Sequence, residues 1–172
     1  EDWPEVTASL QPESCGICHP TQYADWKESW HALGMGDGVL GQLVDLDGKN
    51  DKKVRQCNRC HAPLSEQYPY LEDGVENPTY VPEMRDKGLT CAGCHVRAHQ
   101  RFGPEGKHPP IENAPHDGYT ARDEYKDSRF CYGCHDFSKG DGLEGKRFQE
   151  TYEEWRRTSY AAEGVTCQSC HM

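Results

Sequence analysis

The stretch Cys15-Gly16-Ile17-Cys18-His19 decides the fold, because its pattern of two cysteines separated by two residues and followed at once by histidine recurs four more times. The further copies occupy residues 57–61, 91–95, 131–135 and 167–171. Together the five copies use all 10 cysteines of the chain. C-x-x-C-H is the attachment sequence of c-type haem, whose vinyl groups form thioethers with the two thiols while the histidine binds the iron. The pattern therefore predicts five covalently bound haem c groups.

Each residue of the motif has its own role in this interpretation. Two intervening residues allow both sulfur atoms to reach one edge of the porphyrin, and the next residue then turns beneath its centre. The predicted thioether residues are Cys15, Cys18, Cys57, Cys60, Cys91, Cys94, Cys131, Cys134, Cys167 and Cys170. The predicted proximal iron ligands are His19, His61, His95, His135 and His171.

Disulfide bridges and zinc sites are the alternative uses of paired cysteines. A disulfide framework gives no reason for a histidine after every second cysteine. Zinc ribbons combine two C-x-x-C pairs for each metal ion, and five pairs cannot be divided in that way. Haem attachment explains more of the pattern than either alternative.

The composition indicates a thin protein core. With glycine counted and tyrosine left out, about 39% of the 172 residues are apolar, against roughly 45 to 50% in an ordinary soluble domain. The motifs begin at residues 15, 57, 91, 131 and 167, which leaves room for one short helix and a connecting loop at each. We therefore predict one domain over residues 1–172, mainly α-helical with much irregular loop and little or no β-sheet, in which the porphyrins supply most of the core.

The net charge of -10 limits the classes of partner. An acidic chain argues against nucleic acid, which binds basic surfaces. No apolar run approaches the ~18 to 20 residues of a membrane span. The acidic surface, to which haem propionates would add, favours a redox partner protein with a basic contact face and an association that is sensitive to salt.

The haem chemistry also predicts the compartment. In bacteria the thioethers to haem form outside the cytoplasm, so we expect a periplasmic or extracellular protein. The chain starts at Glu1 with polar residues and shows no secretory signal peptide, as expected if the leader is cleaved or lies outside this sequence.

Histidines outside the motifs are the candidates for the distal side of each iron. They are His31, His99, His108 and His116. Four histidines cannot serve five haems, so at least one haem lacks a distal histidine. Met35 and Met84 are the alternative candidates for the fifth place, although no pattern supports them.

Spacing limits which iron each candidate serves. Two imidazoles on one iron lie about 4 Å apart, whereas residues twelve apart on a straight helix are about 18 Å apart. His31 therefore ligates a haem other than that of His19. His99 stands four residues beyond His95, and if the helix continues, both rings project from one face. We then expect His99 to reach a neighbouring haem or to line its pocket.

A weaker repeat of aromatic residues follows the first motif and precedes the fifth. Each copy places a tryptophan three residues after a tyrosine, and another ring five residues after the tryptophan. The copies are Tyr23, Trp26 and His31, and Tyr152, Trp155 and Tyr160. This spacing, on segments without glycine or proline, suggests an amphipathic helix. Packing on porphyrin faces is the simplest role for both tryptophans.

These residues carry a resemblance to a known group of proteins. The first motif with Tyr23, Trp26, Ser29 and His31 resembles the multihaem cytochromes related to hydroxylamine oxidoreductase and to the tetrahaem cytochrome that accepts its electrons. Residues 88–97 (GLTCAGCHVR) and 155–172, which end in GVTCQSCHM, are similar to segments of octahaem reductases and of the pentahaem nitrite reductase that forms ammonia. The resemblance covers essentially the whole chain.

The resemblance implies a mostly helical scaffold with haems in alternating parallel-stacked and perpendicular pairs, one of them open. By analogy with the tetrahaem carrier, the open haem is the second, on His61. The chain departs from the nitrite reductases, because all five motifs end in histidine where their catalytic motif ends in lysine. Tyr160 stands where those enzymes have a distal histidine, and Gln149 lies near the position of a pocket histidine. Ala98 and His99 stand where a pocket tyrosine follows their third motif.

Two functions agree with these features. The first is an electron-transfer cytochrome that moves electrons along five haems and needs no substrate pocket. The alternative is a reductase of small nitrogen compounds such as nitrite or hydroxylamine at the haem without a distal histidine, with Tyr160 and His99 as candidate catalytic residues. Pairs or filaments of the protein would extend the row of haems, so a homo-oligomer is an open alternative to a single copy.

Residues 45–51 (DLDGKND) begin with Asp-x-Asp, as an EF-hand calcium loop does. The glycine is misplaced for an EF-hand, and Gln56 stands where the loop needs a bidentate glutamate. A solvated turn is the simpler interpretation, with calcium as the alternative.

The thin core leads to a testable expectation. Because the porphyrins replace apolar side chains in the interior, the haem-free chain should not fold. Far-UV circular dichroism of the haem-free protein should lack most of the helical signal of the loaded protein. A haem-free spectrum that matches the loaded one would refute the expectation.

Overall fold

The structure, a computed structural model, describes residues 9–44, 52–71, 73–106, 118–137 and 146–172. These residues form two compact units, one built from the described residues up to Arg101 and the other from those that begin at Phe102. The extent of a single domain over 1–172 stays a prediction. Within the described residues, no helix combines the length and the apolar character needed to cross a membrane.

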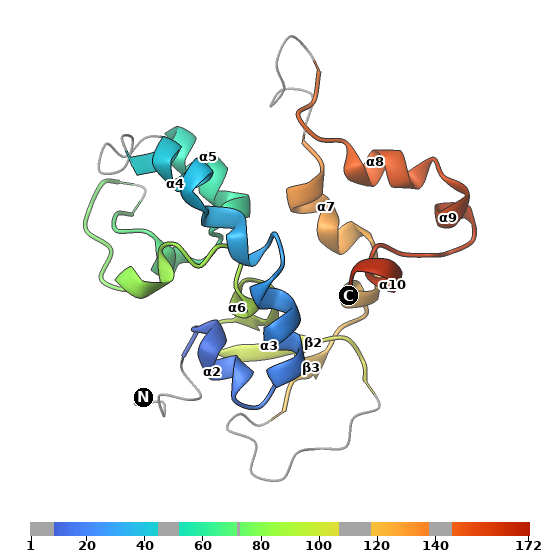
Figure 1. Ribbon diagram of the computed structural model, residues 1–172, viewed down its shortest axis with the longest axis horizontal. Helices are drawn as coiled ribbons and strands as arrows, with labels where there is room; N and C mark the ends of the chain where they lie inside the picture. The colour runs from blue at the N-terminus through green and yellow to red at the C-terminus, as the bar shows by residue number, and fades with distance from the viewer. Residues whose placement is uncertain (1–8, 45–51, 72, 107–117, 138–145) are drawn as a thin grey trace. The chain divides into compact units, whose positions relative to one another are not determined.

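Short helices dominate the first unit (Figure 1). They are α2 (Pro12–Gly16), α3 (Pro20–Lys27), the 3-10 helix η1 (Ala32–Met35), α4 (Asp37–Val44), α5 (Lys52–His61), η2 (Ser65–Gln67), η3 (Pro82–Met84) and α6 (Cys91–His95). Proline occupies the first turn of α2, α3 and η3. Backbone N–H groups in the first turn have no hydrogen-bond acceptor within the helix, so the lack of an N–H in proline costs nothing there.

The second unit has the same character. Its helices are η4 (Asp123–Lys126), α7 (Arg129–His135), α8 (Thr151–Arg156), α9 (Ser159–Ala162) and α10 (Gln168–His171). Three short strands complete the described elements: β1 (Val96–Arg97), β2 (Gln100–Gly103) and β3 (Thr120–Ala121). β1 pairs with β2 in antiparallel register and β2 with β3 in parallel register. The fold is mainly α-helical with much irregular loop and very little sheet, as the sequence predicts.

Every motif lies on a short helix or at its edge, which the motif spacing predicts. The second, third and fourth motifs lie wholly within α5, α6 and α7. The first begins in α2 and ends at His19, the residue before α3. The fifth begins at Cys167, the residue before α10.

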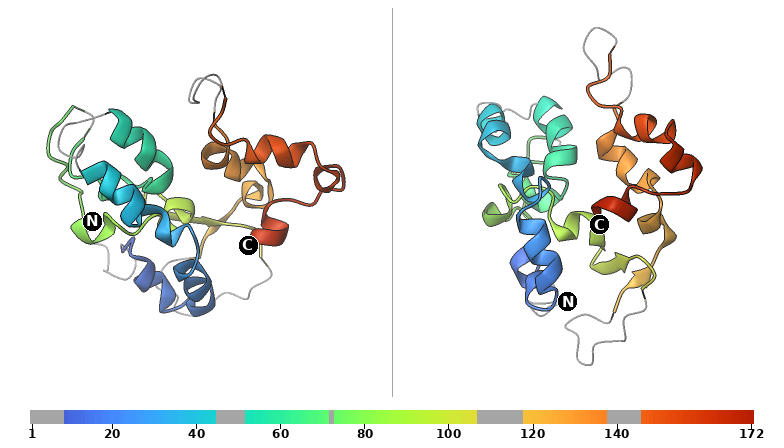
Figure 2. Two further views of the ribbon diagram at one scale, coloured as in Figure 1. Left: turned by 45° about the horizontal axis from the view of Figure 1, so that its top comes forward. Right: turned by 45° about the vertical axis from the view of Figure 1, so that its right-hand side comes forward.

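The apolar core of the described residues is small. Met35, Leu43, Ala62, Met84 and Ala92 are its buried hydrophobic members. The first three form one cluster, which holds α4 beside α5 (Figure 2). Met35 and Met84, the alternative iron ligands, are both buried in the protein interior, which weighs against that role.

The sequence analysis considered a helix that continues from His95 to His99. In the structure the helix at the third motif stops before His99. α6 ends at His95, and the β-branched Val96 begins β1. Ala98 and His99 form the turn to β2 with φ of 48° and 62°, the left-handed backbone that two-residue hairpin turns require. His95 and His99 therefore do not share a helix face.

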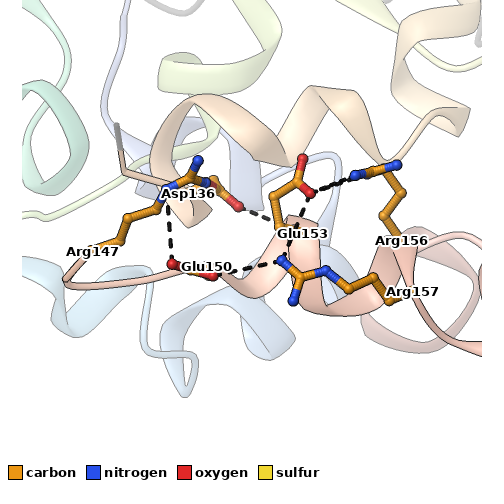
Figure 3. A network of polar contacts seen from close by, with 6 residues as sticks. All are labelled: Asp136, Arg147, Glu150, Glu153, Arg156 and Arg157. Atoms are coloured by element: carbon orange, nitrogen blue, oxygen red, sulfur yellow. Dashed lines mark hydrogen bonds and ion pairs between the residues drawn. The ribbon is translucent and has the colours of Figure 1, made fainter. Parts of the chain in front are cut away.

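A network of charged side chains joins the end of α7 to the start of α8 (Figure 3). The Asp136 side chain is fully buried, with 0% exposure, and accepts a hydrogen bond from Arg147 Nη1 at 2.8 Å. Its other oxygen accepts from the backbone N–H of Glu153 at 3.0 Å, within the first turn of α8. The remaining members are Glu150, Arg156 and Arg157. Asp136, the residue after His135, thus fixes α8 against the fourth motif.

Replacing Asp136 should destabilise this unit strongly. Asp136→Ala leaves the guanidinium of Arg147 without its buried partner, a change that costs about 3 to 5 kcal/mol in buried ion pairs. The control is Glu105→Ala, which breaks the exposed pair of Glu105 with Lys126 at 3.8 Å and should cost about 1 kcal/mol or less. Guanidinium denaturation followed by circular dichroism measures both. Equal midpoints for the two variants would contradict the role of Asp136.

Candidate haem-binding sites

The structure places the predicted attachment residues on the surface or near it. His19 and His171 are exposed, whereas His61, His95 and His135 are half-buried. The structure has no disulfide among the ten cysteines. Among the described residues no three histidine, cysteine, aspartate or glutamate side chains gather as a metal-ion site.

The imidazole of His61 is oriented by the backbone. Its Nδ1 lies 2.5 Å from the carbonyl oxygen of Gly34 in η1. A carbonyl oxygen only accepts hydrogen bonds, so Nδ1 carries the proton and Nε2 keeps its lone pair. An imidazole held in this tautomer is ready to bind iron through Nε2, and the hydrogen bond increases its basicity. The sequence contains no pattern that identifies Gly34 as this partner.

The imidazole of His135 has a side-chain partner instead. Its Nδ1 lies 3.3 Å from Nε2 of Gln149, which also donates to Thr151 Oγ1 at 3.1 Å. Binding of iron by His135 Nε2 requires a proton on Nδ1, and the carboxamide of Gln149 then turns its oxygen to accept it. Gln149, which the resemblance places near a substrate-pocket position, therefore contacts His135, the predicted proximal histidine of the fourth motif.

The first and third motifs lie side by side in the first unit. The thiols of Cys15 and Cys91 are hydrogen-bonded, and this bond lowers the pKa of Cys15 to about 7 and raises that of Cys91. Close to them, Lys87 Nζ lies 2.6 Å from Glu13 Oε1. Burial alone would raise the pKa of the Glu13 carboxyl, but the hydrogen bond and charge of Lys87 hold that pKa below its usual value.

The fourth and fifth motifs are linked in the second unit. Ser128, buried at the start of α7, accepts a hydrogen bond on Oγ from the backbone N–H of Cys167 at 3.0 Å. Gln168 Nε2 donates to the carbonyl oxygen of Asp127 at 2.8 Å. Two hydrogen bonds to Asp127 and Ser128, which precede the fourth motif, thus fix the position of the first two residues of the fifth motif.

Two tryptophans fasten the entry to the third and fifth motifs. Trp26 Nε1 donates to the carbonyl oxygen of Leu89 at 2.8 Å. Trp155 Nε1 donates to that of Val165 at 3.0 Å. Both acceptors lie two residues before the first cysteine of a motif. We call each of these indole-to-carbonyl bonds an indole clamp. Both tryptophans therefore have a defined hydrogen-bonding role, in addition to any packing on a porphyrin.

The aromatic spacing suggests a single helix for each segment that carries a clamp. The structure shows instead that each segment is broken. α3 ends at Lys27 and α8 at Arg156, and the chain bends before the next short helix. At each bend a hydroxyl donates to the carbonyl oxygen of the tryptophan at 2.7 Å, from Ser29 in the first copy and from Thr158 in the second. Side-chain bonds of this kind compete with the helical ladder and end it.

A buried glutamine that the sequence analysis did not identify supports the third motif. Gln67 is 2% exposed, and its Nε2 donates to the carbonyl oxygens of Met84 and Gly88, both at 3.0 Å. Gly88 has a φ of 66°, and a Cβ there would overlap the carbonyl oxygen of His31. The approach to the third motif therefore depends on a polar residue and a glycine that no hydrophobic pattern predicts.

The residues around the motifs fit a large apolar group. Met172 is 80% exposed and Ile17 71%, and they lie directly after the fifth motif and within the first; Trp30, the residue before His31, is 87% exposed. Such side chains are normally covered in a folded protein. Three buried polar atoms without a partner, Asn58 Oδ1, Thr90 Oγ1 and Gln168 Oε1, also belong to a motif or directly precede one. Unsatisfied buried groups are rare and mark places where a ligand or water is expected.

The remaining predicted site residues are placed as follows. His31 lies directly before η1 and is exposed, as is His99 in the hairpin turn. Tyr160 lies in α9 and is 61% exposed. His61 and Tyr160 belong to different units, so their predicted association at one open haem stays a prediction. His108, His116 and the candidate calcium segment 45–51 lie outside the described residues.

Comparison with known proteins agrees with this geometry. The model of the family described as cytochrome c554 and c-prime matches residues 14–96, which include the first three motifs. The chain is 28% identical over 186 residues to cytochrome c nitrite reductase subunit NrfA of Nitratidesulfovibrio vulgaris, an alignment that covers 94% of this chain and 34% of that protein. It is 29% identical over 173 residues to cytochrome c-552 of Haemophilus influenzae, covering 98% of this chain and 28% of that protein.

A third relative, cytochrome c-552 of Parabacteroides distasonis, is 27% identical over 174 residues, or 94% of this chain and 33% of that protein. The chain thus spans about a third of the length of the relatives it matches. No solved structure matches it significantly. The recurrence of the attachment motif, the family match and these relatives lead to one conclusion: the chain contains a region similar to the cytochrome c554 and c-prime family and resembles c-type cytochromes over almost its whole length.

Proposed function

We propose that the chain binds five haem c groups, one at each motif, and carries electrons among them outside the cytoplasm. The observation that carries the proposal is the proximity of motifs within each unit. The Cys15 and Cys91 thiols touch in the first unit, and the Ser128–Cys167 bond joins the fourth and fifth motifs in the second. Attachment sites this close keep neighbouring porphyrins within the short range that electron hopping needs.

Haem c, when bound, supplies the one-electron iron couple, whose potential depends on the axial ligands, hydrogen bonds and burial. The protein contributes these terms through its own residues. Gly34 accepts from the Nδ1 proton of His61, and Gln149 serves His135 in the same way once its oxygen faces Nδ1. A neutral backbone carbonyl and a side-chain carboxamide are distinct partners, so the two proximal ligands differ in basicity.

His31 is the distal ligand that the contacts support best. Its carbonyl oxygen accepts from the backbone N–H of Leu89 at 2.9 Å, which places His31 beside the entry to the third motif. We propose that His31 serves the haem attached there, in agreement with the expectation that it does not serve the haem of His19. His99, His108 and His116 remain the proposed distal ligands for three of the other haems.

We further propose a periplasmic or extracellular location and a redox partner with a basic contact face. The net charge of -10 supports the second part, because complementary charge accelerates association and its effect declines as salt rises. Association with the partner should therefore slow as ionic strength increases.

The haem count tests the proposal directly. The purified protein should contain five haems per chain by the pyridine haemochrome assay, with the corresponding mass by intact mass spectrometry. Cys57→Ser combined with Cys60→Ser removes both attachment atoms of the second motif and should reduce the count to four. Ser65→Ala, near the motif but without an attachment role, is the matched control and should leave five. A wild-type count below five would overturn the proposal.

Reduction of nitrite or hydroxylamine is the second candidate function. Two observations favour it: one relative is named a nitrite reductase subunit, and the chain has only four histidines outside the motifs for five irons. An iron without a distal histidine has a coordination position at which a small nitrogen compound can bind. A vacant position is necessary for this activity and does not by itself supply it, so electron transfer is the proposal we prefer.

Spectra of the oxidised protein separate the two candidates. Electron paramagnetic resonance and optical spectra should show a high-spin ferric signal from the haem that lacks a distal histidine. For a reductase, the signal shifts with nitrite or hydroxylamine, and turnover follows when a reductant is supplied. For a carrier, turnover is absent. Five low-spin haems that ignore both compounds would mean that a fifth distal ligand exists and would exclude the reductase.

A further inference from the structure

The two indole clamps belong to one structural unit that occurs twice, and the second occurrence differs at one chemically decisive residue. In both, an indole N–H bonds the residue two before a motif, and a hydroxyl bonds the carbonyl oxygen of the same tryptophan. The ring of a tyrosine lies beside each tryptophan, with centroids 5.9 Å apart for Tyr23 and 5.4 Å for Tyr152.

The backbone contacts repeat as closely as the side-chain contacts. Ser29 Oγ accepts from Ala32 N, and Thr158 Oγ1 accepts from Ala161 N, both at 3.4 Å. The glycines that open the two motif segments, Gly88 and Gly164, both have positive φ, 66° and 75°. The same local conformation is therefore reached twice, although residues 35–87 separate the two halves of the first copy and the second copy is continuous in sequence.

His31 and Tyr160 occupy the equivalent position in these copies. The carbonyl oxygen of His31 accepts from Leu89 N at 2.9 Å, and that of Tyr160 accepts from Val165 N at 2.8 Å. Each acceptor residue lies five positions after its tryptophan, and each donor lies two positions before its motif. Both side chains are exposed. The backbone of Tyr160 therefore has the same position relative to the fifth motif as the backbone of His31 has relative to the third.

We infer that Tyr160 takes the distal position at the haem of the fifth motif, and that this haem is the one without a distal imidazole. The inference rests on the proposed haem sites and on His31 as the distal ligand at the third motif. A phenol is a weaker ligand of iron than the neutral nitrogen of imidazole and does not replace it as a strong-field ligand. The site then takes a small ligand such as water, nitrite or hydroxylamine beside the phenol hydroxyl. The fifth haem, and not the second on His61, is the open one.

A reciprocal exchange of the two residues tests the inference. Tyr160→His should convert the high-spin ferric signal of the wild type to low spin. His31→Tyr should add a second high-spin haem. Tyr160→Phe should keep the high-spin signal, since a phenyl ring cannot bind iron. Tyr119→His adds an imidazole to an exposed tyrosine of the same unit outside the clamp and is the control, with no change expected. A Tyr160→His protein that stays high-spin, or a Tyr160→Phe protein whose signal shifts, would overturn the inference.

Motif deletion identifies which haem is open. Cys167→Ser with Cys170→Ser should remove one haem and the high-spin signal together. Cys57→Ser with Cys60→Ser should remove one haem and leave the signal in place. The reverse result would return the vacancy to the second haem. The haem count of the wild type and of each variant is measured first. A wild-type count below five would contradict the proposed function. A count of five with the high-spin signal lost at another motif would contradict only the assignment of the open haem.

Discussion

The constraint on which the proposed haem-binding structure depends is the covalent bond between cysteine and porphyrin, because the chain lacks the apolar side chains for an ordinary core. Only five buried hydrophobic residues occur in the part of the chain that the structure describes. Short helices of three to ten residues cannot be stable alone, since nucleation costs more than a few helical bonds return. Large exposed rings such as Trp30 are surfaces that a porphyrin would cover. In the proposed protein the thioethers hold the porphyrins against such surfaces.

Polar contacts perform much of the positioning that apolar packing performs elsewhere. Gln67, Ser128 and the two indole clamps all bond the backbone within a few residues of a motif. A hydrogen bond fixes direction as well as distance, and an iron ligand needs both. Buried Asp136 acts in the same way for the fourth motif, where it joins α7 to α8 (Figure 3). These contacts explain how a loop-rich chain holds several attachment sites in defined places.

The sequence predicted the features that follow from local chemistry. The spacing predicts one short helix at each motif and the composition predicts a small core, and the structure confirms both. The attachment residues, which the motif spelling predicts, stay a prediction. The sequence did not predict contacts between distant segments, such as that of Gly34 with His61, because a carbonyl group has no sequence signature. It also missed the helix breaks at Ser29 and Thr158. There the aromatic period is helical, yet each hydroxyl bonds the backbone and ends the helix.

The duplicated clamp separates the scaffold from the chemistry of the iron. The bonds of Trp26 and Trp155, the hydroxyls and the positive-φ glycines fix the backbone, and none of them involves the side chain five residues after the tryptophan. That side chain can be histidine in one copy and tyrosine in the other without loss of the backbone contacts. In the proposed assignment, a single substitution there changes the ligand of an iron and leaves the backbone contacts in place. The proposed difference between a closed haem and an open haem therefore requires only one residue.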